Sequence, residues 1–216
     1  MFSFLRSSSP PRLNRAVDNP IFYENGKSCL EFRKGSEYFL RNSHPPYDAL
    51  SPSIVNPPFH FHLYQSEHFK IVSGECHLYK NTTHAPWKTI SAADPAAPRT
   101  AIIPKMEFHT LQNASSTDPL VIDVNLAPED FEGEERFFRN FFGYLDDCKR
   151  AGETPSIFQL MVFLKHANTP LGLRLPTRWL SQVASRASLN IMGSIGEWIL
   201  GYESSYREYY VARKGI

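Results

Sequence analysis

The stretch HFHLYQSEHFKIVSG, residues 60–74, carries the most specific pattern of the chain. Side chains two apart on an extended strand point to the same side, so His60 and His62 can present two imidazoles to one point. A short turn then returns the chain on a neighbouring strand, where Glu67 faces inward together with Phe69 and Ile71. The stretch therefore predicts β structure around a cluster of polar ligands.

A second stretch, PKMEFHTLQN at residues 104–113, adds another histidine, His109, after the β-like run 99–103. Seven of the eight histidines lie between His44 and His109, where a uniform scatter would place two or three. This clustering indicates a functional site. The spacing of His60, His62, Glu67 and Gly74 supports it, because chance matches to a pattern of four spaced residues are rare.

The two stretches resemble the motifs of the cupin superfamily: HxH, three or four residues, E, six residues, G in the first, and PxGxxH, three residues, N in the second. The match covers roughly residues 50–126. By this resemblance, four residues fall on the metal-ligand positions of the family: His60, His62, Glu67 and His109. Pro104 and Asn113 fall on its structural positions.

The chain departs from the family pattern at two places. Ile54 stands where the family has a glycine six residues before His60, and Met106 replaces the glycine of the second motif. Both departures concern the geometry of loops, and all four ligand positions remain filled.

We expect a mainly β fold, a cupin-type β-barrel (double-stranded β-helix or jelly roll) with a C-terminal α-helical extension. The expected parts are a flexible N-terminal arm at 1–20, the barrel at 21–128, and a helical extension at 129–216 that packs on the barrel or on a partner. Short alternating runs predict strands at 28–32, 36–40, 68–72, 75–79, 99–103 and 119–126. Apolar periodicity predicts helices at 131–150, 155–167 and 176–201.

The ligand set predicts one divalent transition metal, either Fe, Mn, Ni, Zn or Cu, and no further cofactor. Three neutral imidazoles and one carboxylate leave such an ion a net charge near +1 and two adjacent open coordination sites. Structural zinc is usually closed by four ligands, often thiolates, and no cysteine lies in these motifs. We also expect Glu67 and His109 to be catalytic.

The first functional hypothesis is a metal-dependent enzyme for a small organic metabolite that chelates through two oxygens. It acts as a dioxygenase or as a Lewis-acid isomerase, cyclase or dehydratase. The ending GEWILGYESSYREYY, residues 196–210, resembles the ends of small fungal cupins, some of which accompany natural-product pathways. The alternative is a non-catalytic, metal-stabilised binding module or a dimeric interaction protein, with a homodimer formed through the helical tail.

Composition narrows the partners and the compartment. The 23 basic and 22 acidic residues give a net charge of +1, without the surplus that nucleic-acid binding requires. We therefore expect no nucleic-acid partner, and no apolar run is long enough for a transmembrane segment. Three scattered cysteines and a start too weakly apolar for a secretory signal predict a cytoplasmic protein.

Other polar residues carry weaker expectations. His77 shares a strand face with Glu75 and Tyr79 and is expected at the surface, although it could reach the cavity. Asp123 and Asn125 either line the pocket or face solvent.

Two apolar groups of residues in the helical extension are also notable. An aromatic stripe of Phe137, Phe138, Phe141 and Phe142 is expected to be core or interface, and the apolar segment 189–200 could pair with another subunit or lie on a membrane surface.

Overall fold

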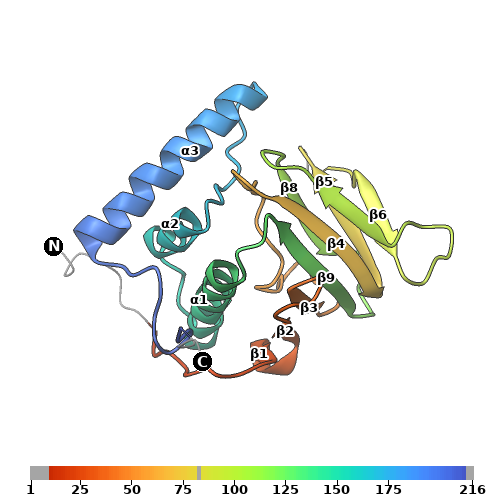
Figure 1. Cartoon of the computed structure of the whole chain (residues 1–216), viewed down its shortest axis with the longest axis horizontal. Coiled ribbons are helices and arrows are strands. Elements are labelled where there is room, and N and C mark those ends of the chain that lie inside the picture. The colour runs from red at the N-terminus through yellow and green to blue at the C-terminus, as the bar shows by residue number, and fades with distance from the viewer. Residues whose placement is uncertain (1–9, 82–83, 213–216) are drawn as a thin grey trace. The chain divides into compact units, whose positions relative to one another are not determined.

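The computed structural model describes residues 10–81 and 84–212. They form two compact units (Figure 1). Asn19–Glu129 form the β unit, while residues 10–18 and 130–212 form the helical unit. Every helix within the described residues is too short or too polar to traverse a bilayer.

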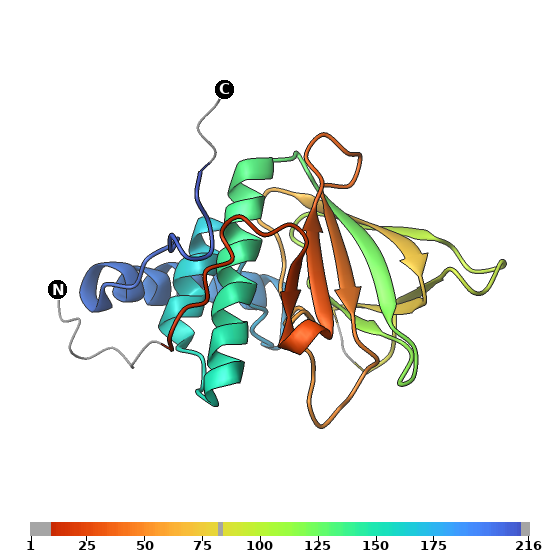
Figure 2. The same ribbon diagram turned by 90° about the horizontal axis from the view of Figure 1, so that it is seen from below.

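The β unit consists of two antiparallel sheets (Figures 1 and 2). The larger has the order β1-β2-β3-β9-β4-β7 and the smaller has the order β6-β5-β8. The bounds are β1 Ile21–Tyr23, β2 Ser28–Phe32, β3 Leu40–His44, β4 Ser66–Ser73, β5 Glu75–Lys80, β6 Lys88–Ser91, β7 Thr100–Ile103, β8 His109–Asn113 and β9 Leu120–Ala127.

Alternation along β4 places the core as the sequence predicts. Glu67, Phe69 and Ile71 are buried, whereas Lys70 is exposed. Glu67 pairs with Ile103 of β7 on one side and with Leu126 of β9 on the other. One inward carboxylate thus lies at the end of an otherwise apolar inner face.

Gly74 alone joins the two sheets at one corner, since β4 ends at Ser73 and β5 begins at Glu75. Its φ is +81°, and a Cβ at this position would lie 2.6 Å from the carbonyl oxygen of Pro119. The position therefore requires glycine both for its backbone conformation and for space.

The mainly β fold with C-terminal helices is confirmed, and the two facing sheets correspond to a jelly roll. In the described residues the ladders form two separate sheets and do not close into one barrel, and a single bridge pairs His60 with His109 at the start of β8. Five prolines lie between residues 45 and 58, in the segment that connects β3 to His60. Proline has no N–H to donate, so this segment cannot extend a ladder.

The strand expected at 36–40 is displaced along the chain, and β3 occupies Leu40–His44 instead. The inward residues of β3 include Asn42 and His44, both buried, so its sequence lacks the apolar alternation of a strand. Because buried positions of β3 hold polar side chains, the apolar alternation did not predict this strand.

The helical unit contains α1 Phe131–Ala151, α2 Ile157–His166 and α3 Arg178–Ser194, followed by the π-helical turn η3 Ile195–Leu200. The three predicted helices are confirmed. Asp130 caps α1 by accepting a hydrogen bond from the backbone N–H of Gly133, and Gly152 ends it in the left-handed conformation. In the aromatic stripe, Phe141 and Phe142 are buried.

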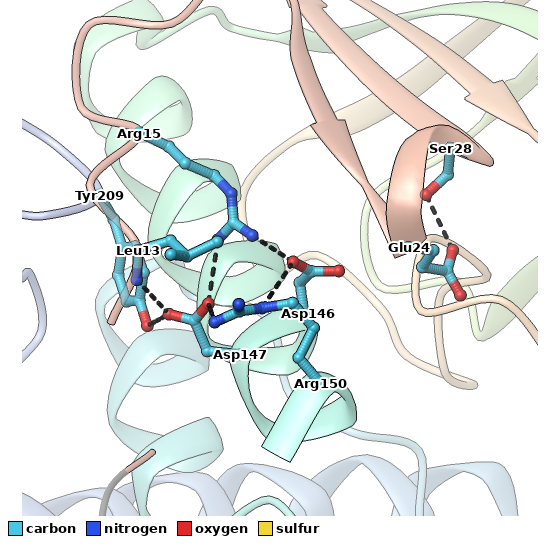
Figure 3. Close-up of polar contacts among 8 residues, drawn as sticks. All are labelled: Leu13, Arg15, Glu24, Ser28, Asp146, Asp147, Arg150 and Tyr209. Atoms are coloured by element: carbon cyan, nitrogen blue, oxygen red, sulfur yellow. Dashed lines mark hydrogen bonds and ion pairs between the residues drawn. The ribbon is translucent and has the colours of Figure 1, made fainter. Parts of the chain in front are cut away.

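Residues 10–18, which we expected to belong to a loose arm, contact the helices of this unit (Figure 3). Arg15 forms ion pairs with Asp146 and Asp147 of α1, and the N–H of Leu13 donates to Asp147. Tyr209, near the other end of the chain, donates to the same Asp147 at 2.7 Å. Residues 1–9 of the expected arm lie outside the described residues.

Replacing Gly74 by alanine should lower the free energy of unfolding by about 2 to 4 kcal/mol, because strain at positive φ adds to the clash with Pro119. Gly35→Ala is the matched control. Gly35 has a φ of +78°, but a Cβ added there would meet no described atom within 4 Å, so only about 1 kcal/mol should be lost. Urea unfolding measures both, and equal losses would contradict the steric argument.

His44 should make stability depend on pH. Burial lowers its pKa to about 4, against a partial opposing effect of its hydrogen bond with Asn56. The unfolded chain therefore binds the additional proton between pH 6.5 and 4, and stability present above pH 6.5 is lost as the pH falls through this range, by up to about 3 kcal/mol. Urea unfolding of chelator-treated protein should show a shallower pH dependence for His44→Gln than for the wild type. An equal pH dependence in His44→Gln and in the wild type would contradict this account.

Candidate metal centre

The site is assembled from three separate segments of the β unit. His60 and His62 lie on an extended segment, His109 begins β8, and Glu67 lies near the start of β4. His60 and His109 exchange two backbone hydrogen bonds, of 3.0 and 2.8 Å. The His60–His62 segment thus pairs with β8, and not with the strand of Glu67 as we expected. Glu67 approaches from the opposite sheet.

The four side chains converge. One ligand atom from each residue lies within 4.8 Å of those of the other three, and all four residues are buried. Oε2 of Glu67 is 2.6 Å from Nε2 of His109, 3.2 Å from Nε2 of His62 and 4.0 Å from Nε2 of His60. This geometry fits a single metal site built from three imidazole nitrogens and one carboxylate.

Backbone carbonyls orient two of the imidazoles. Nδ1 of His60 lies 2.7 Å from the carbonyl oxygen of Pro58, and Nδ1 of His109 lies 2.9 Å from that of Glu107. A carbonyl oxygen only accepts, so in both rings Nδ1 carries the proton. In a neutral ring, Nε2 then presents its lone pair to the centre, as a metal ligand must.

The short contact between Glu67 and His109 tests whether the residues suit a cation. A neutral Nε2 and a carboxylate oxygen are both acceptors, so 2.6 Å between them requires either a proton or a positive ion. Burial raises the pKa of Glu67, but hydrogen bonds from His109 and His62 outweigh it and hold the pKa well below its usual value. The carboxylate is therefore ionised and suited to bind a metal.

The protonation state of His60 also suits metal binding. Burial, together with the neighbouring His109 and His62, lowers its pKa well below the ordinary 6.5. Its imidazole is therefore neutral near pH 7, which is the form that binds metal.

Aromatic side chains pack the two motifs against each other. Phe61, between the two motif histidines, is fully buried and meets Phe108 edge to face with ring centroids 4.7 Å apart. Phe59 stacks on the same Phe108 ring at 5.5 Å. Sequence reasoning did not assign these phenylalanines, although each flanks a motif histidine directly.

The loop before β8 explains one departure from the family pattern. Met106 occupies the motif's glycine position and adopts a φ of +64°, the left-handed conformation that glycine favours. Its N–H donates to the carbonyl of His62 at 2.8 Å, which ties the two motifs together. The side chain of the neighbouring Glu107 is buried and bonded to Asn81 at 2.7 Å, so its role is to hold this loop.

The weaker candidates lie away from the cluster. His77 is on the outer face of β5 and bonds to Thr89 at 3.0 Å. Asp123 neither lines the pocket nor faces solvent, because it is buried on the outer face of β9 in ion pairs with Arg33 and Arg41. Asn125 shares that outer face and lies opposite His68.

Three fungal proteins named as oxidoreductases are similar to the chain. The probable oxidoreductase virH of Hypocrea virens is 29% identical over 211 residues, covering 94% of this chain and 92% of that protein. Oxidoreductase iacF of Pestalotiopsis fici is 28% identical over 76% of this chain and 81% of its own length. The probable oxidoreductase yanE of Aspergillus niger is 26% identical over 92% and 79%. These names support an enzyme in general terms.

No known family model matches the chain. Among solved structures, the cupin domain of Drosophila melanogaster CENP-C is 12% identical with a TM-score of 0.35, covering 56% of this chain and 86% of that chain. A cupin-superfamily sugar phosphate isomerase from Silicibacter pomeroyi is 19% identical with a TM-score of 0.32, covering 55% and 65%. Likenesses this weak carry no argument about function. The two antiparallel sheets, the two motifs and the buried cluster of three histidines and one glutamate give the chain the fold of the cupin superfamily.

Proposed function

We propose that the protein is a metal-dependent cupin oxidoreductase that acts on a small organic metabolite able to chelate through two oxygens, such as an enol, a β-dicarbonyl or a hydroxy acid. Substrates of this kind suit natural-product tailoring. A divalent transition ion bound at the cluster would supply Lewis acidity and open coordination sites for substrate and for dioxygen or water.

The convergence of the four ligand atoms within 4.8 Å carries this proposal. Three neutral imidazoles with one carboxylate form an open ligand set, whereas a closed structural site usually uses four ligands that include thiolates. All three cysteines lie outside the cluster. The names of the fungal relatives, which match most of the chain, favour redox chemistry over isomerisation.

The protein's own residues have distinct proposed tasks. His60, His62 and His109 would hold the ion through Nε2, and the Pro58 and Glu107 carbonyls keep the rings of His60 and His109 oriented. Glu67 supplies the single negative charge.

Glu67 and His109 are the proposed catalytic residues. Their closest atoms, Oε2 and Nε2, are 2.6 Å apart, so the pair can hold a proton whenever no ion lies between them.

The decisive experiment is elemental analysis of protein purified with and without oxygen, followed by oxygen-uptake assays with β-dicarbonyl, enol and hydroxy-acid metabolites. Metal-dependent oxygen consumption with product formation would support the proposal. Turnover without oxygen consumption would replace it with an isomerase, cyclase or dehydratase. Stoichiometric metal without any turnover across the panel would favour a non-catalytic module.

The double variant His60→Ala/His62→Ala should lose its metal, from about one ion per chain to a small fraction of that value, since two of four ligands are removed. Elemental analysis with parallel circular dichroism measures the loss and checks folding. His68→Ala is the matched control, because His68 lies one residue from Glu67 but faces outward on β4. Retention of stoichiometric metal by the double variant would exclude this ligand assignment.

A further inference from the structure

Helix α3 buries a mostly small or polar face and exposes an apolar one, the reverse of an ordinary surface helix. Its buried face consists of residues four apart, and three of the four are small or polar: Ser181, Ser185, Leu189 and Gly193. The hydroxyls of Ser185 and Ser181 accept the backbone N–H groups of Leu173 and Leu175, and a Cβ on Gly193 would lie 2.8 Å from Lys165. This face therefore packs closely against its own unit and leaves little room for large side chains.

The opposite face of α3 is apolar and exposed. Leu180, Val183, Ala187 and Ile191 recur at intervals of three and four residues and form what we call the outer stripe. Val183 is 45% exposed and Ile191 is 60% exposed. Trp179 at the start of the helix and Trp198 in η3 are 67% and 71% exposed.

Charged residues on α3 itself are all basic, and Glu197 beside Trp198 in η3 is paired with Lys165 and His166. Residues 154–196 contain no aspartate or glutamate, although a uniform scatter of the 22 acidic residues would place roughly four there. Three exposed arginines lie on or just before α3: Arg174, Arg178 and Arg186. An occupant of this surface must therefore combine apolar groups with negative charge.

A second copy of the chain fits this requirement poorly. Antiparallel pairing of two outer stripes about Ala187, the small residue near the middle of α3, would place Arg186 of each copy on the same side of the interface. Two like charges in one interface disfavour that pairing.

An anionic lipid surface fits the requirement well. Tryptophans concentrate at the boundary between headgroups and acyl chains, and helices with an apolar face and flanking arginines lie in that plane. We propose that the outer stripe of α3, with Trp179 and Trp198 at its ends, binds reversibly to anionic lipid membranes.

Co-flotation of the full-length protein with vesicles tests this proposal. Binding should occur with phosphatidylcholine vesicles that contain phosphatidylserine and should fall several-fold with pure phosphatidylcholine or at high salt, since lipid charge contributes about fivefold for each arginine near the surface. These measurements need no variant. Equal binding to neutral and anionic vesicles, or none to either, would overturn the proposal.

Variants on the exposed face locate the contact. Val183→Ser/Ile191→Ser should lower partitioning by at least about tenfold, because two side chains no longer enter the apolar layer. Arg186→Glu should lower partitioning to anionic vesicles alone. Leu50→Ser is the control, since Leu50 is 97% exposed but lies in the β unit, and it should bind as the wild type does.

Two further measurements identify competing occupants of the outer stripe. Thermal unfolding of Val183→Ser/Ile191→Ser should match that of the wild type, and sedimentation should show the wild type as a monomer without lipid. A wild-type dimer that this double variant dissociates would assign the stripe to a second copy and overturn the proposal. A lowered melting temperature together with unchanged flotation would assign it to packing within the chain and would also overturn it.

Discussion

The charge of the Glu67 carboxylate is the constraint on which the β unit depends. An ionised carboxylate buried in a protein is costly unless cations or hydrogen-bond donors surround it. Here its Oε2 lies 2.6 Å from His109 and 3.2 Å from His62, and these histidines come from segments beyond its own sheet. Satisfying one buried charge thus brings the two sheets together at this end of the unit, and the same contacts form the candidate metal site.

Backbone groups, and not dedicated side chains, orient two of the three histidines. His60 and His109 each place Nδ1 against the carbonyl of the residue two positions earlier, Pro58 in one case and Glu107 in the other. The two histidines also face each other across an antiparallel bridge. A repeated local conformation therefore orients both rings, and the site needs few dedicated side chains outside its four members.

Sequence reasoning located the four clustered residues because the spacing of the two motifs is specific. It also located the three helices, whose apolar periodicity is regular. It failed where polar side chains are buried. Asn42 and His44 point inward, so the apolar pattern did not reveal β3.

Other features could not be read from residue types at all. The carbonyls that orient the imidazoles belong to the backbone, which every residue shares. Met106 holds a glycine conformation without being glycine. Small buried residues on α3 left its apolar side chains outside, so the pattern alone did not show which face packs.

The contacts of Asp147 have a consequence for the order in which the two units fold during synthesis. Leu13 and Arg15 bind this aspartate from the start of the chain, and Tyr209 binds it from near the end. The helical unit is therefore discontinuous in sequence, with the whole β unit inserted between its two parts. During synthesis the β unit has every strand available once residue 129 has left the ribosome. The contact of Tyr209 forms only after the whole of α1 has been made, so completion of the helical unit is the last step of folding, whereas Leu13 and Arg15 can meet Asp147 as soon as α1 has emerged.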